Sequence, residues 1–153
     1  MGVTEKLAEL GLTLPPVVPP VASYVPAVRS GEHVFTSGQL PMVDGALTAT
    51  GKVGAEVSAE DATAAARVCA LNALAAIDAL VGIDSVVRIV KVVGFVASAP
   101  GFTGQPGVIN GASNLLGELF GDAGIHARSA VGVAELPLGA AVEVEMIVEV
   151  APA

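Results

Sequence analysis

The sequence predicts a single α+β domain in which two helices cover one face of a β-sheet. Three observations lead to this fold class. Residues 142–150 alternate valine or methionine with glutamate or isoleucine, the period of a strand that buries one face. Residues 86–97 are rich in β-branched side chains and form too short a run for a buried helix. Residues 58–81 and 106–120 instead carry apolar side chains at helical spacing. The expected order is β-β-α-β-α-β-β.

The composition limits the classes of partner. A chain of 153 residues can bury a core without a disulfide or a metal. Apolar residues make up 53% and charged residues 14%, so we expect another subunit to cover part of the apolar surface. The net charge of -8 makes nucleic acid an unfavourable partner. The single cysteine, Cys69, excludes an internal disulfide and a cysteine-based zinc site. Its alanine-rich surroundings indicate a buried hydrophobe rather than a nucleophile.

The expected location is the cytoplasm. No uninterrupted apolar run reaches the ~18–20 residues that span a bilayer. The start, "MGVTEKLAELG", contains acidic residues and no continuous apolar region, so it does not resemble a secretory signal.

Residues 1–20 are expected to form an N-terminal arm of the domain 1–153. A short amphipathic helix over 3–11 is followed by "LPPVVPP" at 14–20, whose four prolines forbid a helix and favour an extended segment.

The first half of the sheet is expected to consist of two strands, over 22–29 and 33–38, with Gly31 in the turn. Residues 41–57, rich in Gly, Thr and Asp, predict a loop. Ser58, followed three residues later by Asp61, resembles a capping pair at the start of the first long helix, which we expect to end at Gly82.

The second half continues with the strand 86–97, a loop over 98–106 and the second helix, which "GDAGIHA" interrupts. Two more strands follow in residues 126–150, with the turn at "LPLG". One face of the last strand mixes Glu with Ile, which indicates a face that meets another subunit.

Common catalytic motifs are absent. "GALTATGKV" has one residue too many for a phosphate-binding loop, and Val53 stands where Ser or Thr must reach magnesium. "GASNL" lacks the second glycine of a nucleophile elbow. His33 and His126 are too isolated to indicate a metal site; a loop histidine such as His126 is most often a surface residue, and a catalytic role is the alternative.

Arg128 is the remaining candidate. It stands at the start of a strand among small apolar residues, and a half-buried guanidinium needs a carboxylate. The partner is either Glu143 or Glu145 on the next strand, in an internal ion pair, or the carboxylate of a substrate that Arg128 binds bidentately.

Several segments resemble the RidA/YjgF family of reactive-intermediate deaminases, also called L-PSP endoribonucleases. They are "YVPAVRSG" and "VFTSGQLP" near the N-terminus, and "ARSAVGVAELP" followed by "VEVE" near the C-terminus. The resemblance covers about four-fifths of the chain. It implies a chorismate mutase-like domain, a barrel built by three subunits, and pockets between neighbouring subunits.

The resemblance also implies roles for individual residues. Arg128 would bind the substrate carboxylate, and Glu143 would position a water molecule. Substrate binding is also implied for Tyr24, Ser37, Gly38 and Asn110. Structural roles are the alternative for these residues: a core or interface aromatic, strand ends, or a hydrogen bond near the start of a helix.

The sequence departs from the family pattern close to the expected pocket. Ala130 stands where many deaminases of the family carry cysteine, and Pro26 replaces a polar residue. The proline-rich arm and the loop "SAPGFTGQPG" are additional, which is typical of a longer subgroup.

The implied activity is the hydrolysis of small 2-imino or enamine acids to 2-keto acids and ammonia, without a metal or an organic cofactor. The alternative is a non-catalytic homotrimer that binds small carboxylate ligands in a regulatory role. The ribonuclease activity that some names of the family imply fits poorly, because the chain is acidic and offers no basic, aromatic-lined groove.

Overall fold

The sheet has five strands with β7 at its centre. The computed structural model describes residues 2–20 and 22–153; Met1, with which the expected arm begins, and Val21 lie outside them. In spatial order the strands are β1 (Ala27–Ser30), β2 (His33–Thr36), β7 (Val142–Val150), β5 (Val86–Ala97) and β6 (Ala127–Val133). The β5–β6 pair is parallel and the other pairs are antiparallel.

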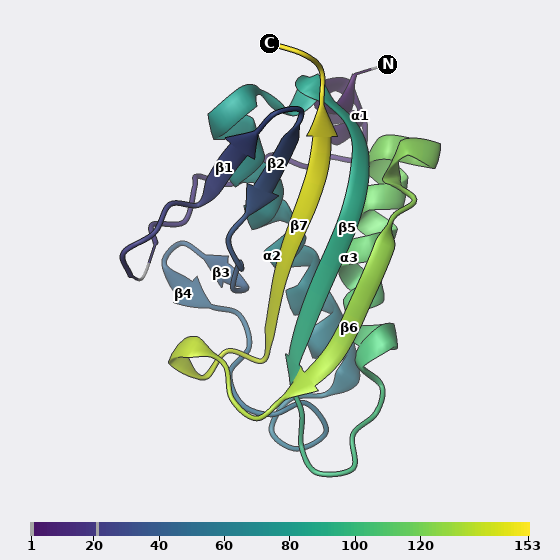
Figure 1. Ribbon diagram of the computed structural model, residues 1–153. Helices are drawn as coiled ribbons and strands as arrows, with labels where there is room; N and C mark the ends of the chain where they lie inside the picture. Colours follow the sequence, from purple (N-terminus) through teal and green to yellow (C-terminus); the bar gives the residue numbers. More distant parts are fainter. Residues whose placement is uncertain (1, 21) are drawn as a thin grey trace.

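Two long helices, α2 (Ala59–Val81) and α3 (Gln105–Phe120), lie side by side on one face of this sheet (Figure 1). α2 packs against β7, and α3 packs against β5 and β6. The predicted α+β class, with both helices on the same face, is therefore confirmed. The opposite face of the sheet carries no helix among the described residues.

The ends of α2 lie where the capping signals predict. The Ser58 hydroxyl accepts a hydrogen bond from the backbone N–H of Asp61 at 3.0 Å, which satisfies one of the free donors of the first turn. Gly82 ends the helix with φ of 81°, a conformation that side chains with a Cβ rarely adopt.

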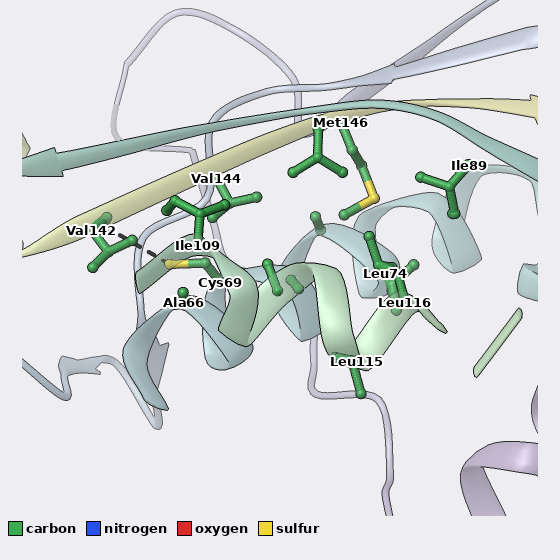
Figure 2. Close-up of a cluster of buried hydrophobic side chains, with 14 of the residues drawn as sticks. Ala66, Cys69, Leu74, Ile89, Ile109, Leu115, Leu116, Val142, Val144 and Met146 are labelled. Atoms are coloured by element: carbon green, nitrogen blue, oxygen red, sulfur yellow. Dashed lines mark hydrogen bonds between the residues drawn. The ribbon is translucent and has the colours of Figure 1, made fainter. Parts of the chain in front are cut away.

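The core lies between the helices and the inner face of the sheet (Figure 2). The predicted alternation of β7 is confirmed, since its inner positions are buried: Val142, Val144, Met146, Val148 and Val150. α2 meets them mainly with alanines and with Cys69, small side chains that let the helix approach the strand closely. Cys69 is fully buried, and this burial raises the pKa of its thiol well above the usual value. The prediction of a buried cysteine is confirmed.

α2 is the one helix in the described ranges that is long and apolar enough to cross a membrane. Of its apolar window, 56% is buried inside the fold, against β7 and α3. The core of the domain therefore accounts for the apolar character of this helix.

Three predicted segments differ from the structure. β1 begins at Ala27 rather than residue 22, so Tyr24 lies in a bend before the strand. β2 ends at Thr36, and the expected loop 41–57 contains a small hairpin of β3 (Met42–Val43) and β4 (Ala46–Leu47). The predicted turn at "LPLG" is confirmed, as a 3₁₀-type turn over Pro137–Gly139.

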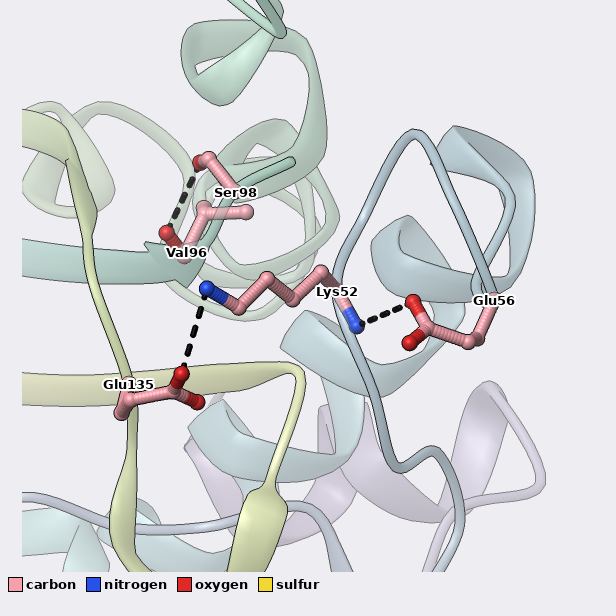
Figure 3. A network of polar contacts seen from close by, with 5 residues as sticks. All are labelled: Lys52, Glu56, Val96, Ser98 and Glu135. Carbon is pink, nitrogen blue, oxygen red and sulfur yellow. Dashed lines mark hydrogen bonds and ion pairs between the residues drawn. The ribbon is translucent and has the colours of Figure 1, made fainter. Parts of the chain in front are cut away.

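Lys52 joins two loops near the end of β5 (Figure 3). Its Nζ lies 3.2 Å from Oε1 of Glu135, which follows β6, while its backbone N–H donates to Oε2 of Glu56 at 3.1 Å. In the same region the Ser98 hydroxyl donates to the carbonyl of Val96 at 2.9 Å. The loop that precedes α2 is thereby tied to the loop between β6 and β7.

α1 (Val3–Glu9) is the predicted amphipathic helix, somewhat shorter than expected, and buries Val3 and Leu7. The first turn of α1 is held by Asp84, which lies in a 3₁₀ turn before β5. Its two carboxylate oxygens accept the backbone N–H of Thr4 at 3.0 Å and the Thr4 hydroxyl at 2.6 Å. These hydrogen bonds lower the pKa of Asp84.

Candidate functional site

Arg128 lies on β6, the strand at one edge of the sheet, next to α3 (Figure 1). The register pairs Arg128 with Val92 of β5, and Val92 pairs in turn with Met146 of β7. Both partners are buried on the helix-covered face. Because paired residues point to the same side of a sheet, Arg128 also projects from this face, toward α3.

The guanidinium of Arg128 is held by α3. Nη1 donates to Oδ1 of Asn110 at 2.8 Å and to Oγ of Ser113 at 3.2 Å, and Nη2 donates to the carbonyl of Pro106 at 3.2 Å. A guanidinium has five N–H donors. Nε–H and the second Nη2–H bond to no atom of the described residues.

Among the described residues, no carboxylate forms an ion pair with Arg128. In residues 2–20 and 22–153, ion pairs within 4.0 Å involve only Lys6, Lys52 and Arg67 as the basic partners. The alternative in which Arg128 forms an internal ion pair with Glu143 or Glu145 is therefore wrong. A partly buried cation with two donors left over is suited to an external anion.

His126 lies beside Arg128 and is not a simple surface residue. Its Nε2 is 2.9 Å from Oγ of Ser113, and its Nδ1 is 2.6 Å from the carbonyl of Gly124. Ser113 thus contacts both His126 and Arg128. Sequence reasoning missed Ser113, although it lies three residues after Asn110 on the same helix face. We call Arg128, Asn110, Ser113 and His126 the arginine cluster.

An open hollow of about 320 Å³ adjoins the arginine cluster. Ser113, His126 and Arg128 provide its polar wall, and Gly117, Gly124 and Ile125 provide the rest. A small molecule bound to Arg128 could extend into this space.

Glu143 lies on the other face of the sheet. It pairs with Phe95 of β5, two positions from the pair Val93–Glu145 on the same open face. Burial raises the pKa of the half-buried Glu143 carboxyl, and the negative charge of Glu145 raises it further. A carboxylate with a raised pKa is a stronger base than an exposed one, which suits it to accept a proton from water.

Gly38 provides the space that Glu143 occupies. It follows β2, where Gln39 forms a bridge with Val144 of β7. A Cβ atom on Gly38 would overlap the carboxylate of Glu143. The expected site residues Gly38 and Glu143 are therefore in contact.

Tyr24 and Ser37 lie close to Gly38. The Ser37 hydroxyl donates to the carbonyl of Val25 at 2.6 Å, and its N–H donates to the carbonyl of Pro26 at 2.8 Å. Tyr24, 44% exposed, lines a small hollow together with Pro26 and Gly38. We call Glu143, Tyr24, Ser37 and Gly38 the glutamate cluster.

Ala130 follows Arg128 by two positions and faces the same side of β6. It pairs with Gly94 and packs against the core. Because its side chain is a methyl group, this position supplies no nucleophile. Within residues 2–20 and 22–153, no three His, Cys, Asp or Glu side chains lie close enough together to hold a metal ion.

The six expected site residues thus fall into two groups. Arg128 and Asn110 belong to the arginine cluster, beside α3; the glutamate cluster holds the other four. Within one chain the sheet separates Arg128 from Glu143. A substrate could contact both only where two chains meet.

Comparison with known proteins supports the fold and the family. The profile of the family described as "YjgF/chorismate mutase-like, putative endoribonuclease" matches residues 4–150. The protein TCP17 of Trypanosoma cruzi is 47% identical over 149 residues, which cover 96% of this chain and 93% of TCP17.

Solved structures give the same result. Atu1372 of Agrobacterium tumefaciens, whose function is described as unknown, is 46% identical with a TM-score of 0.87, over 97% of this chain and 91% of its own. TdcF of E. coli, solved with bound serine, is 27% identical with a TM-score of 0.63, over 90% of this chain and 93% of its own. The α+β, chorismate mutase-like fold is therefore confirmed, and the chain belongs to the RidA/YjgF family.

Proposed function

We propose that this protein hydrolyses small 2-imino acids, such as 2-iminopropanoate, and their enamine tautomers to 2-keto acids and ammonia. The observation that carries the proposal is the state of Arg128: a partly buried guanidinium, oriented by α3, with no carboxylate partner in the described chain and two donors left over. Such a group selects an acid anion.

A relative supports the choice of substrate class. TdcF of E. coli was solved with bound serine. Serine carries a nitrogen on the carbon next to its carboxylate, and a 2-imino acid has the same arrangement. A site that accommodates this arrangement would place the C=N carbon a fixed distance from the arginine.

The reaction needs little beyond binding, water and proton transfer, because an imine carbon is already electrophilic. Glu143 would take a proton as water attacks the carbon, the C=N π electrons would move to nitrogen, and nitrogen would accept a proton. Glu143 would supply that proton, which gives the carbinolamine. The carbinolamine hydroxyl would then give its proton to Glu143, which would pass it to the departing nitrogen as the C–N bond breaks, releasing ammonia and the keto acid. The raised pKa of Glu143 favours both acceptance and return of the proton. No metal or organic cofactor enters this scheme.

The site would lie between subunits of a homotrimer. The open face of the sheet leaves apolar side chains partly uncovered, among them Val28, Phe35 and Val131, which are 50%, 40% and 46% exposed. A second chain that covers this face would bury them and could bring the arginine cluster of one subunit to the glutamate cluster of its neighbour. Small carboxylates are the ligands we expect, with no nucleic acid or membrane partner, in the cytoplasm.

A coupled assay tests the activity. An amino-acid oxidase generates the imine in situ, and the protein is expected to accelerate its conversion to keto acid and ammonia. Arg128→Ala should abolish the acceleration; an unchanged rate in this variant would refute the role of Arg128.

A binding protein without turnover is the second candidate. Ala130, which supplies no nucleophile, and Pro26, which lines the small hollow beside Tyr24, favour it. Keto acids that bind and raise the melting temperature, without any acceleration of imine decay, would select this function over the enzyme.

A further inference from the structure

Ser113 connects His126 to Arg128. Its Oγ lies 2.9 Å from Nε2 of His126 and 3.2 Å from Nη1 of Arg128. The three side chains come from different elements: Ser113 from the middle of α3, His126 from the residue before β6, and Arg128 from β6 itself.

The hydrogen-bond partners assign the protons. The carbonyl of Gly124, 2.6 Å from Nδ1 of His126, can only accept, so Nδ1 carries the hydrogen of the neutral ring. Nε2 is then an acceptor, and the Ser113 hydroxyl donates to it. The Ser113 oxygen keeps its lone pairs for the N–H of Arg128. Each contact along this chain, from Arg128 through Ser113 to His126 and Gly124, therefore joins a donor to an acceptor.

The alternative for a helical hydroxyl is visible in the same protein. Thr63, on α2, donates to the carbonyl four residues earlier, that of Ala59, at 2.7 Å. Ser113 donates to His126 instead. Without an acceptor at the position of Nε2, the Ser113 hydroxyl would turn to the carbonyl of Ile109, and its oxygen would move away from Arg128.

We propose that His126 is a positioning residue for Arg128 and acts through Ser113. By accepting the Ser113 proton, it holds the serine oxygen against Nη1 and so fixes the plane in which the two remaining donors of Arg128 meet a carboxylate. This inference rests on the proposed role of Arg128 in binding the acid anion.

Two substitutions of His126 separate positioning from packing. In His126→Gln the side-chain carbonyl can take the place of Nε2 and accept from Ser113. In His126→Asn the amide N–H₂ can take the place of Nδ1 and donate to Gly124, but no acceptor reaches Ser113. For 2-ketobutyrate measured by calorimetry, we expect His126→Asn to raise Kd by about fivefold, the effect of one lost hydrogen bond. The Kd of His126→Gln should stay within about twofold of the wild-type value.

A double-mutant cycle with Ser113→Ala tests the route. If His126 acts through Ser113, then Ser113→Ala should raise Kd as much as His126→Asn, and the double variant should be no weaker than either. Additive losses would mean that His126 contacts the ligand directly, and wild-type affinity in His126→Asn would show that His126 positions nothing; either result overturns the proposal.

A measurement without ligand keeps this test separate from the proposed function. The chain has four arginines, and Arg88 is exposed on β5, so ¹⁵Nε relaxation can compare Arg128 with Arg88. We expect Arg128 to be ordered in the wild type and in His126→Gln, and to approach the mobility of Arg88 in His126→Asn. Unchanged order in His126→Asn contradicts the proposal, whether or not keto acids bind. Keto-acid affinity that survives Arg128→Ala contradicts the proposed function alone.

Discussion

Arg128 and Glu143 project from opposite faces of the same sheet. Arg128 pairs with the buried Val92 on the helix-covered face, and Glu143 pairs with Phe95 on the open face. The two residues that the family resemblance assigns to one pocket therefore cannot face one small substrate within a single chain. This separation, together with the uncovered apolar side chains of the open face, is the reason for placing the proposed site between subunits.

Glu143→Gln is expected to lower the rate of imine hydrolysis by about 10²–10⁴-fold, the usual contribution of a general base. Glutamine keeps the shape of the side chain but cannot accept the proton. The coupled oxidase assay measures this loss, and binding of 2-ketobutyrate provides the control. A variant that binds and turns over like the wild type would exclude Glu143 as the base.

The same substitution should stabilise the fold at neutral pH. The folded protein raises the pKa of Glu143, so its ionised form is unfavourable there. This penalty is absent below the pKa of the unfolded chain and complete above the raised pKa of the folded one. The melting temperature of Glu143→Gln should therefore exceed that of the wild type near pH 7, and the difference should disappear in acid. A difference that is independent of pH would contradict the assigned cause.

Gly38→Ala should displace the Glu143 carboxylate, because the added Cβ would occupy its place. We expect a loss of about 1–3 kcal/mol in the free energy of unfolding, as for overpacked sites, and a loss of turnover. Gly107→Ala is the matched control: the added Cβ meets open space on α3, where alanine should stabilise the helix by about 0.5–1 kcal/mol. Equal effects of the two substitutions in urea unfolding would show that Gly38 is not constrained by Glu143.

Asn110→Asp should block Arg128 with an internal carboxylate. Asn110 Oδ1 already accepts from Nη1 at 2.8 Å, so aspartate at this position would pair with the guanidinium and compete with an incoming anion. We expect Kd for 2-ketobutyrate to rise by about tenfold or more, whereas Asn110→Ala, which removes one hydrogen bond, should raise it only a few-fold. Calorimetry on both variants decides; a larger loss in the alanine variant would contradict the competition.

Asp84→Asn should loosen α1 in a pH-dependent way. Hydrogen bonds from Thr4 lower the pKa of Asp84, so their stabilisation is present above the pKa of the unfolded chain and is lost as the pH falls through the folded value. Because the group is exposed, we expect a loss of less than about 1 kcal/mol at pH 7 and none in strong acid. Urea unfolding at several pH values tests this; a constant loss would point to packing instead.

The longest patterns in the sequence were the most informative about the fold. β5 and β7 have the predicted bounds, because runs of β-branched or alternating residues leave few alternatives. β1 is shorter than predicted: Pro26 lacks an N–H, and the ladder to β2 begins only at the pair of Ala27 with Thr36. The β3–β4 hairpin had a signal that was overlooked, Asp44–Gly45 between apolar residues, and both adopt positive φ.

The candidate site was less accessible to sequence reasoning. Whether Arg128 on β6 faces the same side of the sheet as Glu143 on β7 depends on the registers in which both strands pair with β5. Neither spacing nor composition reveals these registers. The contact of Ser113 with His126 likewise requires the crossing of α3 with the chain before β6. The family resemblance did indicate Asn110 and Arg128, which the structure brings together.

A mixing experiment tests the central claim most directly. Arg128→Ala and Glu143→Gln should each be inactive alone, but subunits unfolded together and refolded as mixed assemblies of the proposed homotrimer should regain activity. If each site takes Arg128 from one chain and Glu143 from its neighbour, random assembly restores about a quarter of the sites. Recovery near that fraction is the predicted result. No recovery from mixed trimers that have formed would contradict a site shared between subunits.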